Sequence, residues 1–212
     1  MTPYSKVTRD YEDYLLRLIF RRGMTISGCI HNAYLDLNRT LHGMRKLPEG
    51  ADLRSKAEAS IAAALTLLKT SLAAPTQQAD FDKWHRTTCD NLVSVYGNAF
   101  PFTAGEAQKW VNMTVKYIYT IGEDRIPGFG AAYAFCHAPL DNDVLDALWQ
   151  YGFDGLSKAW SRIDYDEYFK CQEWIRNKFK PTPPLSIEFY LWMGINNIST
   201  STSRLRAEKG HS

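Results

Sequence analysis

The sequence lacks the features that most directly indicate a metal site or a membrane span. Its four cysteines (Cys29, Cys89, Cys136 and Cys171) form no CxxC pair, and no histidine stands at zinc-ligand spacing, so we expect neither a metal nor a cofactor. No apolar run reaches the length of a membrane span, and the opening residues lack the apolar stretch of a signal peptide. We therefore expect a cytoplasmic protein with reduced cysteines.

The chain also has little excess charge, with a formal net charge of +2 over 212 residues. This excludes a strongly basic polyelectrolyte but not a DNA enzyme, because a small footprint on DNA needs only a local basic patch. With 45% hydrophobic and 23% charged residues, the composition indicates a globular chain that can bury a core. Strict two-residue alternation is missing, so we expect no sheet.

Helical periodicity recurs along the chain and predicts an all-α fold. We expect helices over residues 10–22, 30–44, 52–74, 80–96, 106–121, 141–151, 156–162, 165–179 and 185–196. Residues 122–138 are expected to form a long loop, and the basic tail 199–212 to be flexible. We expect residues 1–198 to form one domain, or two lobes with a cleft between them.

The stretch Phe102-Thr-Ala-Gly-Glu-Ala-Gln-Lys has the pattern of a tight hairpin that opens a helix. Gly105 suits a sharp turn, and the free N–H groups at a helix start suit a DNA phosphate. Lys109 and Lys116 are two helical turns apart and share one face. The alternatives are an ordinary turn between helices and a solvent-exposed face for the lysines.

Pro139-Leu-Asp-Asn-Asp places Asp141 at a helix N-cap. Capping alone explains such an aspartate. A functional reading is that helix N–H groups keep the carboxylate ionised. Its negative charge then stabilises the cation that forms at C1′ of a nucleotide as the base leaves. Asp143 and Asp146 are competing carboxylates.

In these features the sequence resembles the helix-hairpin-helix DNA glycosylase superfamily. The likeness rests on Gln108-Lys109, on Lys116, on the Pro139-Leu-Asp141 step and on the 32-residue spacing between Lys109 and Asp141 (141 − 109). The nearest relatives suggested are the archaeal 8-oxoguanine DNA glycosylases, and the likeness covers roughly residues 96–149. It implies a two-lobed helical fold with the active site in the cleft between the lobes.

In this resemblance Lys109 is the nucleophile that attacks C1′ and Asp141 is the assisting carboxylate, with AP-lyase activity through a Schiff base. We expect Thr103, Gly105, Gln108 and Lys116 to bind the DNA backbone.

The chain departs from the superfamily pattern at its hairpin. A Pro-Gly-Val-Gly-type turn is absent before Lys109, and the Pro-Gly-Phe-Gly at 127–130 is only eleven residues before Asp141. In the commoner branch the lysine precedes the hairpin, whereas residues 87–100 contain no lysine. A monofunctional glycosylase that uses Asp141 and water therefore stays open, with Lys109 as a phosphate contact.

A flipped base needs aromatic or apolar walls and a few polar groups. The candidates are Trp84, Trp110, Phe129, His31 and His137, although core packing also explains the aromatic residues. The long loop 122–138 predicts a roomy pocket. The expected substrate is a modified base in DNA, either oxidised guanine or a hypermodified phage cytosine removed in antiphage defence, and the expected state is a monomer.

An alternative from another class is a non-catalytic helical module that binds nucleic acid or a protein. It predicts that Lys109 and Asp141 lie far apart on separate surfaces. A metal-dependent hydrolase using Asp141, Asp143, His137 or His31 has no dense ligand pattern to support it.

Overall fold

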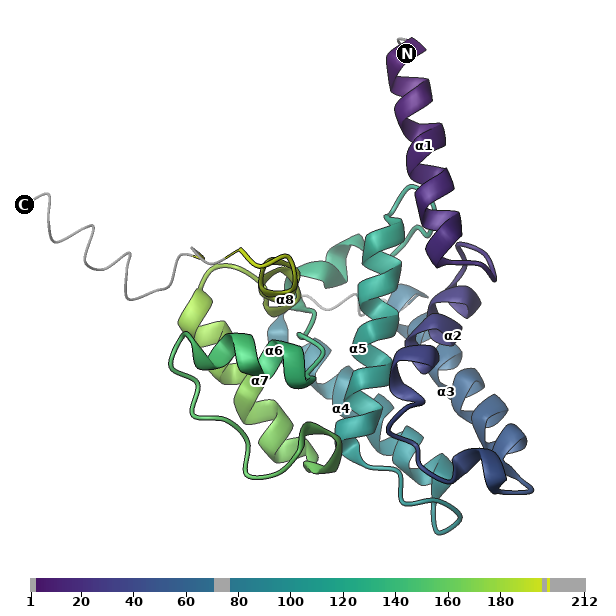
Figure 1. Cartoon of the computed structure of the whole chain (residues 1–212), viewed down its shortest axis with the longest axis vertical. Helices are drawn as coiled ribbons and strands as arrows, with labels where there is room; N and C mark the ends of the chain where they lie inside the picture. The colour runs from purple at the N-terminus through teal and green to yellow at the C-terminus, as the bar shows by residue number, and fades with distance from the viewer. Residues whose placement is uncertain (1–2, 71–76, 196–197, 199–212) are drawn as a thin grey trace, which may run out of the picture.

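The computed structural model describes residues 3–70, 77–195 and 198, and within them the regular structure is entirely helical (Figure 1). The α-helices are α1 (Pro3–Ile19), α2 (Ile26–Leu37), α3 (Gly50–Thr70), α4 (Gln78–Tyr96), α5 (Ala104–Ile121), α6 (Asn142–Trp149), α7 (Tyr165–Phe179) and α8 (Pro184–Trp192). Three short 3-10 helices are η1 (Met44–Lys46), η2 (Gly130–Phe135) and η3 (Trp160–Arg162). The all-α prediction is confirmed, while the predicted flexible tail 199–212 lies outside the described residues.

The centre of the molecule is α5 (Figure 1). Helices α2 and α4 both pack directly on α5, and α3 packs on α2 and α4. Helices α6, α7 and α8 lie on the other side of α5 and contact one another through α8. Fourteen of the 18 residues of α5 are buried, including its two lysines, so nearly every polar side chain of this helix must find a partner inside the protein.

The predicted helix 30–44 begins four residues earlier and ends seven residues earlier than expected. Thr25 caps the start of α2 by accepting a hydrogen bond from the Gly28 N–H at 3.1 Å. At the other end the Thr40 hydroxyl donates to the Leu37 carbonyl, which offers the backbone an alternative to further helical bonds. The chain therefore leaves the helix at Leu37 and turns beside α5.

The predicted helix 156–162 is wrong for most of its length. Only η3 is helical, and the residues before it run as an irregular segment after Gly152 and Gly155, which both have positive φ. The Ser157 N–H donates to the side chain of Glu167, which ties this irregular segment to α7.

The predicted loop 122–138 contains η2 and is anchored at its first turn. The Glu123 carboxylate accepts hydrogen bonds from the Gly128 and Phe129 N–H groups, and Phe129 is buried in the core. Helix α1 projects from the body (Figure 1), and its large hydrophobic side chains Tyr11, Tyr14 and Leu18 are exposed.

Candidate active site

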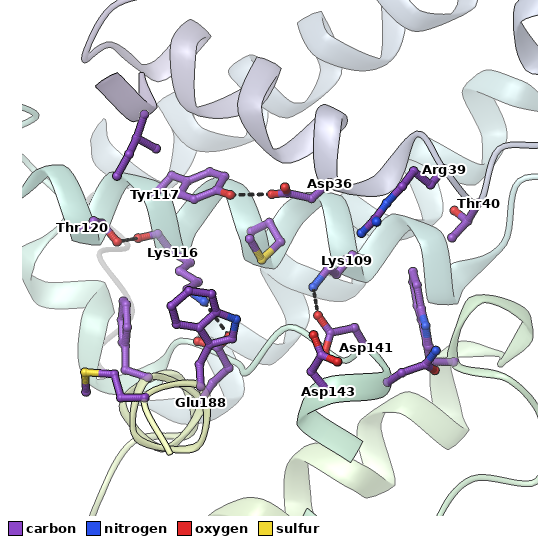
Figure 2. Close-up of a pocket in the computed structure, with 17 residues that line it drawn as sticks. Asp36, Arg39, Thr40, Lys109, Lys116, Tyr117, Thr120, Asp141, Asp143 and Glu188 are labelled. Atoms are coloured by element: carbon purple, nitrogen blue, oxygen red, sulfur yellow. Dashed lines mark hydrogen bonds and ion pairs between the residues drawn. The ribbon is translucent and has the colours of Figure 1, made fainter. Parts of the chain in front are cut away.

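A cavity of about 910 Å³ lies along one face of α5. One wall comes from α2 and the turn that follows it, with Asp36, Arg39 and Thr40. The opposite wall comes from the start of α6 and from α8 (Figure 2). The floor is α5 itself, so the face that carries Lys109 and Lys116 is turned towards the cavity.

Lys109 and Asp141 meet at one end of this cavity (Figure 2). The Lys109 ammonium donates a short hydrogen bond to Oδ2 of Asp141 and forms an ion pair with it. The lysine side chain is only 7% exposed, whereas the aspartate side chain is 25% exposed on the cavity wall. An amine and a carboxylate that are distant in sequence therefore lie side by side at the edge of an open space.

The second oxygen of Asp141 is held by the helix that it caps. Oδ1 accepts a hydrogen bond from the Val144 N–H at 2.9 Å, as predicted for an N-cap residue. The positive end of α6 and the ammonium of Lys109 both stabilise the negative charge. The carboxylate is thus fixed in orientation, with Oδ2 turned towards the lysine.

Two turns further along α5, Lys116 forms a second ion pair with Glu188 of α8 at 2.6 Å. The Glu188 side chain is 2% exposed, and its other oxygen, Oε2, has no hydrogen-bond partner. Burial raises the pKa of the Glu188 carboxyl, and the nearby Lys116 ammonium opposes that rise. One oxygen of this cavity-lining carboxyl therefore has hydrogen-bonding capacity that the protein leaves unused.

A third polar pair lies on the wall formed by α2. The Tyr117 hydroxyl donates to Oδ2 of Asp36 (Figure 2), and burial raises the pKa of the Asp36 carboxyl. The cavity therefore has carboxylates on both walls as well as the two lysines on its floor.

Aromatic side chains line the Glu188 end of the cavity. Phe189 and Trp192 of α8 each lie over the Lys116 ammonium, with distances of 5.2 and 5.5 Å from the nitrogen to the ring centroids. Trp192 is 70% exposed, and Met193 beside it is also exposed. Flat, partly exposed rings beside a buried polar group suit a planar, polar ligand.

The residues expected to bind the DNA backbone are largely occupied inside the protein. The Thr103 hydroxyl bonds to the Ser161 carbonyl and takes part in a capping box with Glu106. The Gly105 N–H donates to the Ile163 carbonyl, and a Cβ at Gly105 would lie 2.0 Å from the Trp160 carbonyl oxygen. The glycine therefore serves a close approach to η3 and not a turn with positive φ. The N–H groups of Gly105, Glu106 and Ala107 are all bonded within the protein and are not free for a phosphate.

The other two expected backbone contacts are also internal. Gln108 is fully buried and bonds to the backbone of Leu140. Lys116 does line the cavity, but as the partner of Glu188.

None of the five residues expected around the flipped base lines the cavity. Trp110 is fully buried and its indole N–H donates to the Ile30 carbonyl. Trp84 donates to the Ala64 carbonyl and lines a separate groove of about 520 Å³ between α3 and α4.

The remaining three expected pocket residues are likewise turned elsewhere. His31 accepts from Arg54, Phe129 lies in the core, and His137 bonds to Tyr168 and Asp82. The loop 122–138 does not line the cavity either, so the space comes from the separation of α2 from α6 and α8.

Several cavity residues were not identified from the sequence: Asp36, Arg39, Glu188, Phe189 and Trp192. The signal available for Glu188 was that it is the single charged residue in the mainly apolar helix α8. Pairing it with Lys116, which is 72 residues away, required the fold.

No family model, curated protein or solved structure matches this chain. Within the described ranges, no helix has the length and apolar character needed to cross a membrane. In the same part of the chain, no group of three or more histidine, cysteine, aspartate or glutamate side chains is placed to hold a metal ion. The geometry of the cavity is therefore the basis for assigning a function.

Proposed function

We propose that this protein is a DNA glycosylase that draws a modified base out of DNA into the α5 cavity and cuts its glycosidic bond. The observation that carries the proposal is the contact between Lys109 and Asp141 at the cavity wall. A non-catalytic binding module predicts these two side chains on separate surfaces, which is not the arrangement found. Two lobes with the active site between them are part of the same proposal.

The position of the two ion pairs suggests how a nucleotide lies in the cavity. Lys109 and Lys116 are seven residues apart, which is about 10 Å along the helix axis. With C1′ of the sugar beside Lys109 and Asp141, the attached base extends towards Glu188. There the unpaired carboxyl oxygen accepts from the N–H groups at the edge of a guanine or cytosine derivative, and Trp192 stacks on its face.

The chemistry assigned to Asp141 is electrostatic. When the bond between C1′ and the base nitrogen breaks, its electron pair leaves with the base and positive charge develops on the sugar. A fixed carboxylate beside C1′ stabilises that charge in the transition state more than in the ground state. The N-cap bond from Val144 keeps this carboxylate in place.

Lys109 adds a covalent step. Its ammonium passes a proton by way of Oδ2 of Asp141, the nearest acceptor, to the departing base, so Asp141 is again a carboxylate when the freed lone pair of Lys109 forms a bond to C1′. Opening of the sugar ring then gives a Schiff base, from which elimination of the 3′ phosphate nicks the strand. If water attacks C1′ instead, Asp141 receives the proton from water and no covalent intermediate forms.

The test is incubation with duplex DNA that carries either 8-oxoguanine or a hypermodified cytosine, scored for abasic sites. Excision of oxidised guanine supports a role in repair, and excision of the phage base supports antiphage defence. Asp141→Asn should abolish most of the excision. Asp143→Asn is the matched control, because Asp143 also lines the cavity in the first turn of α6 but forms no ion pair with Lys109.

Trapping with borohydride separates the two routes. A covalent adduct with abasic DNA that is lost in Lys109→Gln supports the lysine route, and excision without an adduct supports the water route. Cleavage by Asp141→Asn at the wild-type rate would overturn the proposal.

A further inference from the structure

The segment that carries Asp141 has an unusual position in this helical fold. Residues 136–140 are all buried, yet from His137 to Leu140 they belong to no helix or strand. Buried backbone N–H and C=O groups need hydrogen-bond partners, and here neither a helical turn nor a neighbouring strand supplies them. At Ala138 and Leu140, side chains from α7 and α5 take that role.

Gln108 bonds to both backbone groups of Leu140. Its Nε2 donates to the Leu140 carbonyl at 3.0 Å, and its Oε1 accepts from the Leu140 N–H at 3.2 Å. Two opposed hydrogen bonds fix both the distance and the rotation of the segment relative to α5. We refer to this pair of bonds as the Gln108 clip.

The Gln108 clip sets the register of the catalytic pair. Gln108 precedes Lys109 on α5, and Leu140 precedes Asp141, so both contacts span 32 residues. Because Leu140 is fixed against Gln108, the next residue of the segment, Asp141, is held beside the next residue of α5, Lys109. Helix α6 itself packs chiefly on α8 and not on α5, so its packing does not substitute for the clip.

The clip is supported from behind by a chain of hydrogen bonds. The Asn112 amide donates to Oε1 of Gln108 at 3.2 Å and to the Tyr168 hydroxyl at 2.8 Å. Tyr168 donates to Nδ1 of His137, whose Nε2–H donates to Asp82. Burial lowers the pKa of His137, which keeps the imidazole neutral and suits this order of donors and acceptors.

Gln172 of α7 offers an internal comparison, because it binds the same segment in the same way. Its Oε1 accepts from the Ala138 N–H at 3.0 Å, and its Nε2 donates to the Ala138 carbonyl at 2.8 Å. Both glutamines are fully buried. The two glutamines differ in the residue that they hold. Gln172 bonds to Ala138, three residues before Asp141, whereas Gln108 bonds to Leu140, which is next to Asp141.

We propose that Gln108 is a positioning residue that aligns Asp141 with Lys109 through the Leu140 backbone. Its contribution to excision rests on the proposed function, but its effect on the ion pair does not. Gln108 touches no substrate and acts only through its neighbours. A purely structural glutamine would affect stability alone, as Gln172 is expected to do.

The experiment compares Gln108→Met with Gln172→Met. Each variant keeps the length of the side chain and removes two hydrogen bonds to the same segment. Gln108→Met also removes the bond from Asn112, so it should lower the urea midpoint at least as much as Gln172→Met. The first readout is the rate at which an amine-reactive reagent modifies Lys109 relative to Lys116, followed by mass spectrometry. We expect this ratio to rise several-fold in Gln108→Met and to stay at the wild-type value in Gln172→Met.

The second readout is single-turnover excision, together with affinity for DNA that carries an uncleavable abasic analogue. Gln108→Met should lower the excision rate about 100-fold at unchanged affinity, since a displacement of about 1 Å has an effect of that size. Gln172→Met should stay within a few-fold of wild type.

An unchanged Lys109:Lys116 ratio in Gln108→Met would overturn the proposal, whatever the protein catalyses. A raised ratio in a protein whose wild type excises no base would leave the positioning role in place and overturn the glycosylase function instead. If the methionine variant does not fold, Gln108→Asn gives the same test, because its amide reaches one methylene less far towards Leu140.

Discussion

The cavity holds two lysine–carboxylate pairs, which differ in the exposure and the hydrogen bonding of the carboxylate. Lys109–Asp141 and Lys116–Glu188 start from the same helix and point towards the same space (Figure 2). Asp141 is a quarter exposed and has both oxygens engaged, one by Lys109 and one by Val144. Glu188 is almost fully buried and has one oxygen without a partner.

The same two chemical groups are therefore suited to different tasks. A carboxylate with a helix N-terminus on one side and an ammonium on the other is fixed in orientation between two positive groups, which fits the stabilisation of a cation. A buried carboxyl with an unpaired oxygen fits recognition, because a ligand that donates to it replaces a missing hydrogen bond. Environment, more than residue type, separates the two ends of the cavity.

The largest expected effect tests this division directly. Asp141→Asn should lower the single-turnover excision rate about 10³-fold with little change in affinity for DNA, because it removes charge from the transition state. Glu188→Gln should instead alter the preference between 8-oxoguanine and hypermodified cytosine, by about 10- to 100-fold, because it changes a donor–acceptor match. Equal losses of rate on every base in both variants would contradict the comparison.

The second prediction concerns stability. Lys116→Met leaves Glu188 buried without its partner, and removing one member of a buried pair costs about 3–5 kcal/mol. Lys109→Met leaves Asp141 partly exposed and still capping α6, so we expect a loss of about 1 kcal/mol. Urea denaturation of both variants checks this. The double variant Lys116→Met with Glu188→Leu is the control and should recover most of the stability.

Glu106 tests whether burial alone raises the pKa of a carboxyl in this fold. Burial raises the pKa of Glu106 to about 7 from an ordinary 4.5, and no lysine pairs with it. The folded state then binds more protons than the unfolded state between these values, so wild-type stability falls as pH rises from 4.5 to 7. The expected loss is roughly 3 kcal/mol at most, from 1.36 kcal/mol per pH unit.

The measurement is the free energy of unfolding of Glu106→Gln and wild type between pH 4 and pH 8. The amide keeps the acceptor for the Thr103 N–H, so capping is retained. The variant should match wild type at pH 4 and exceed it at pH 8. Parallel curves over the whole range would show that burial does not shift this group.

The smallest expected effects are on DNA affinity, and they distinguish a contact to the DNA backbone at the Lys109 end of the cavity from a contact to the base at the Glu188 end. Arg39→Ala, at the Lys109 end, should weaken binding to any DNA a few-fold and reduce the salt slope by about one. Trp192→Ala, at the Glu188 end, should weaken binding by about 10-fold only when the DNA carries the target base. Titrations at several salt concentrations, with and without the modified base, distinguish these outcomes.

Much of the fold could be predicted from local signals, and the errors also have local causes. The helix α7 was predicted to the residue because Asp164 caps its start and its apolar face repeats with helical period. The helix expected over 156–162 was wrong because Gly155 and a hydrogen bond to Glu167 hold that segment outside helical geometry. The residues that line the cavity could not be predicted, because a tryptophan or histidine such as Trp110 or His137 looks the same in the sequence whether it lines a cavity or fills a core.

By itself the sequence determined the all-helical class, the two lysines on one face of α5 and the N-cap role of Asp141. These depend on periodicity and capping, which act over a few residues. Only the tertiary structure decided that Asp141 lies against Lys109, that Glu188 lies against Lys116, and that the cavity lies between α2 and α8. Such contacts join residues tens of positions apart, and their geometry depends on how buried groups such as Gln108 satisfy their hydrogen bonds across helices.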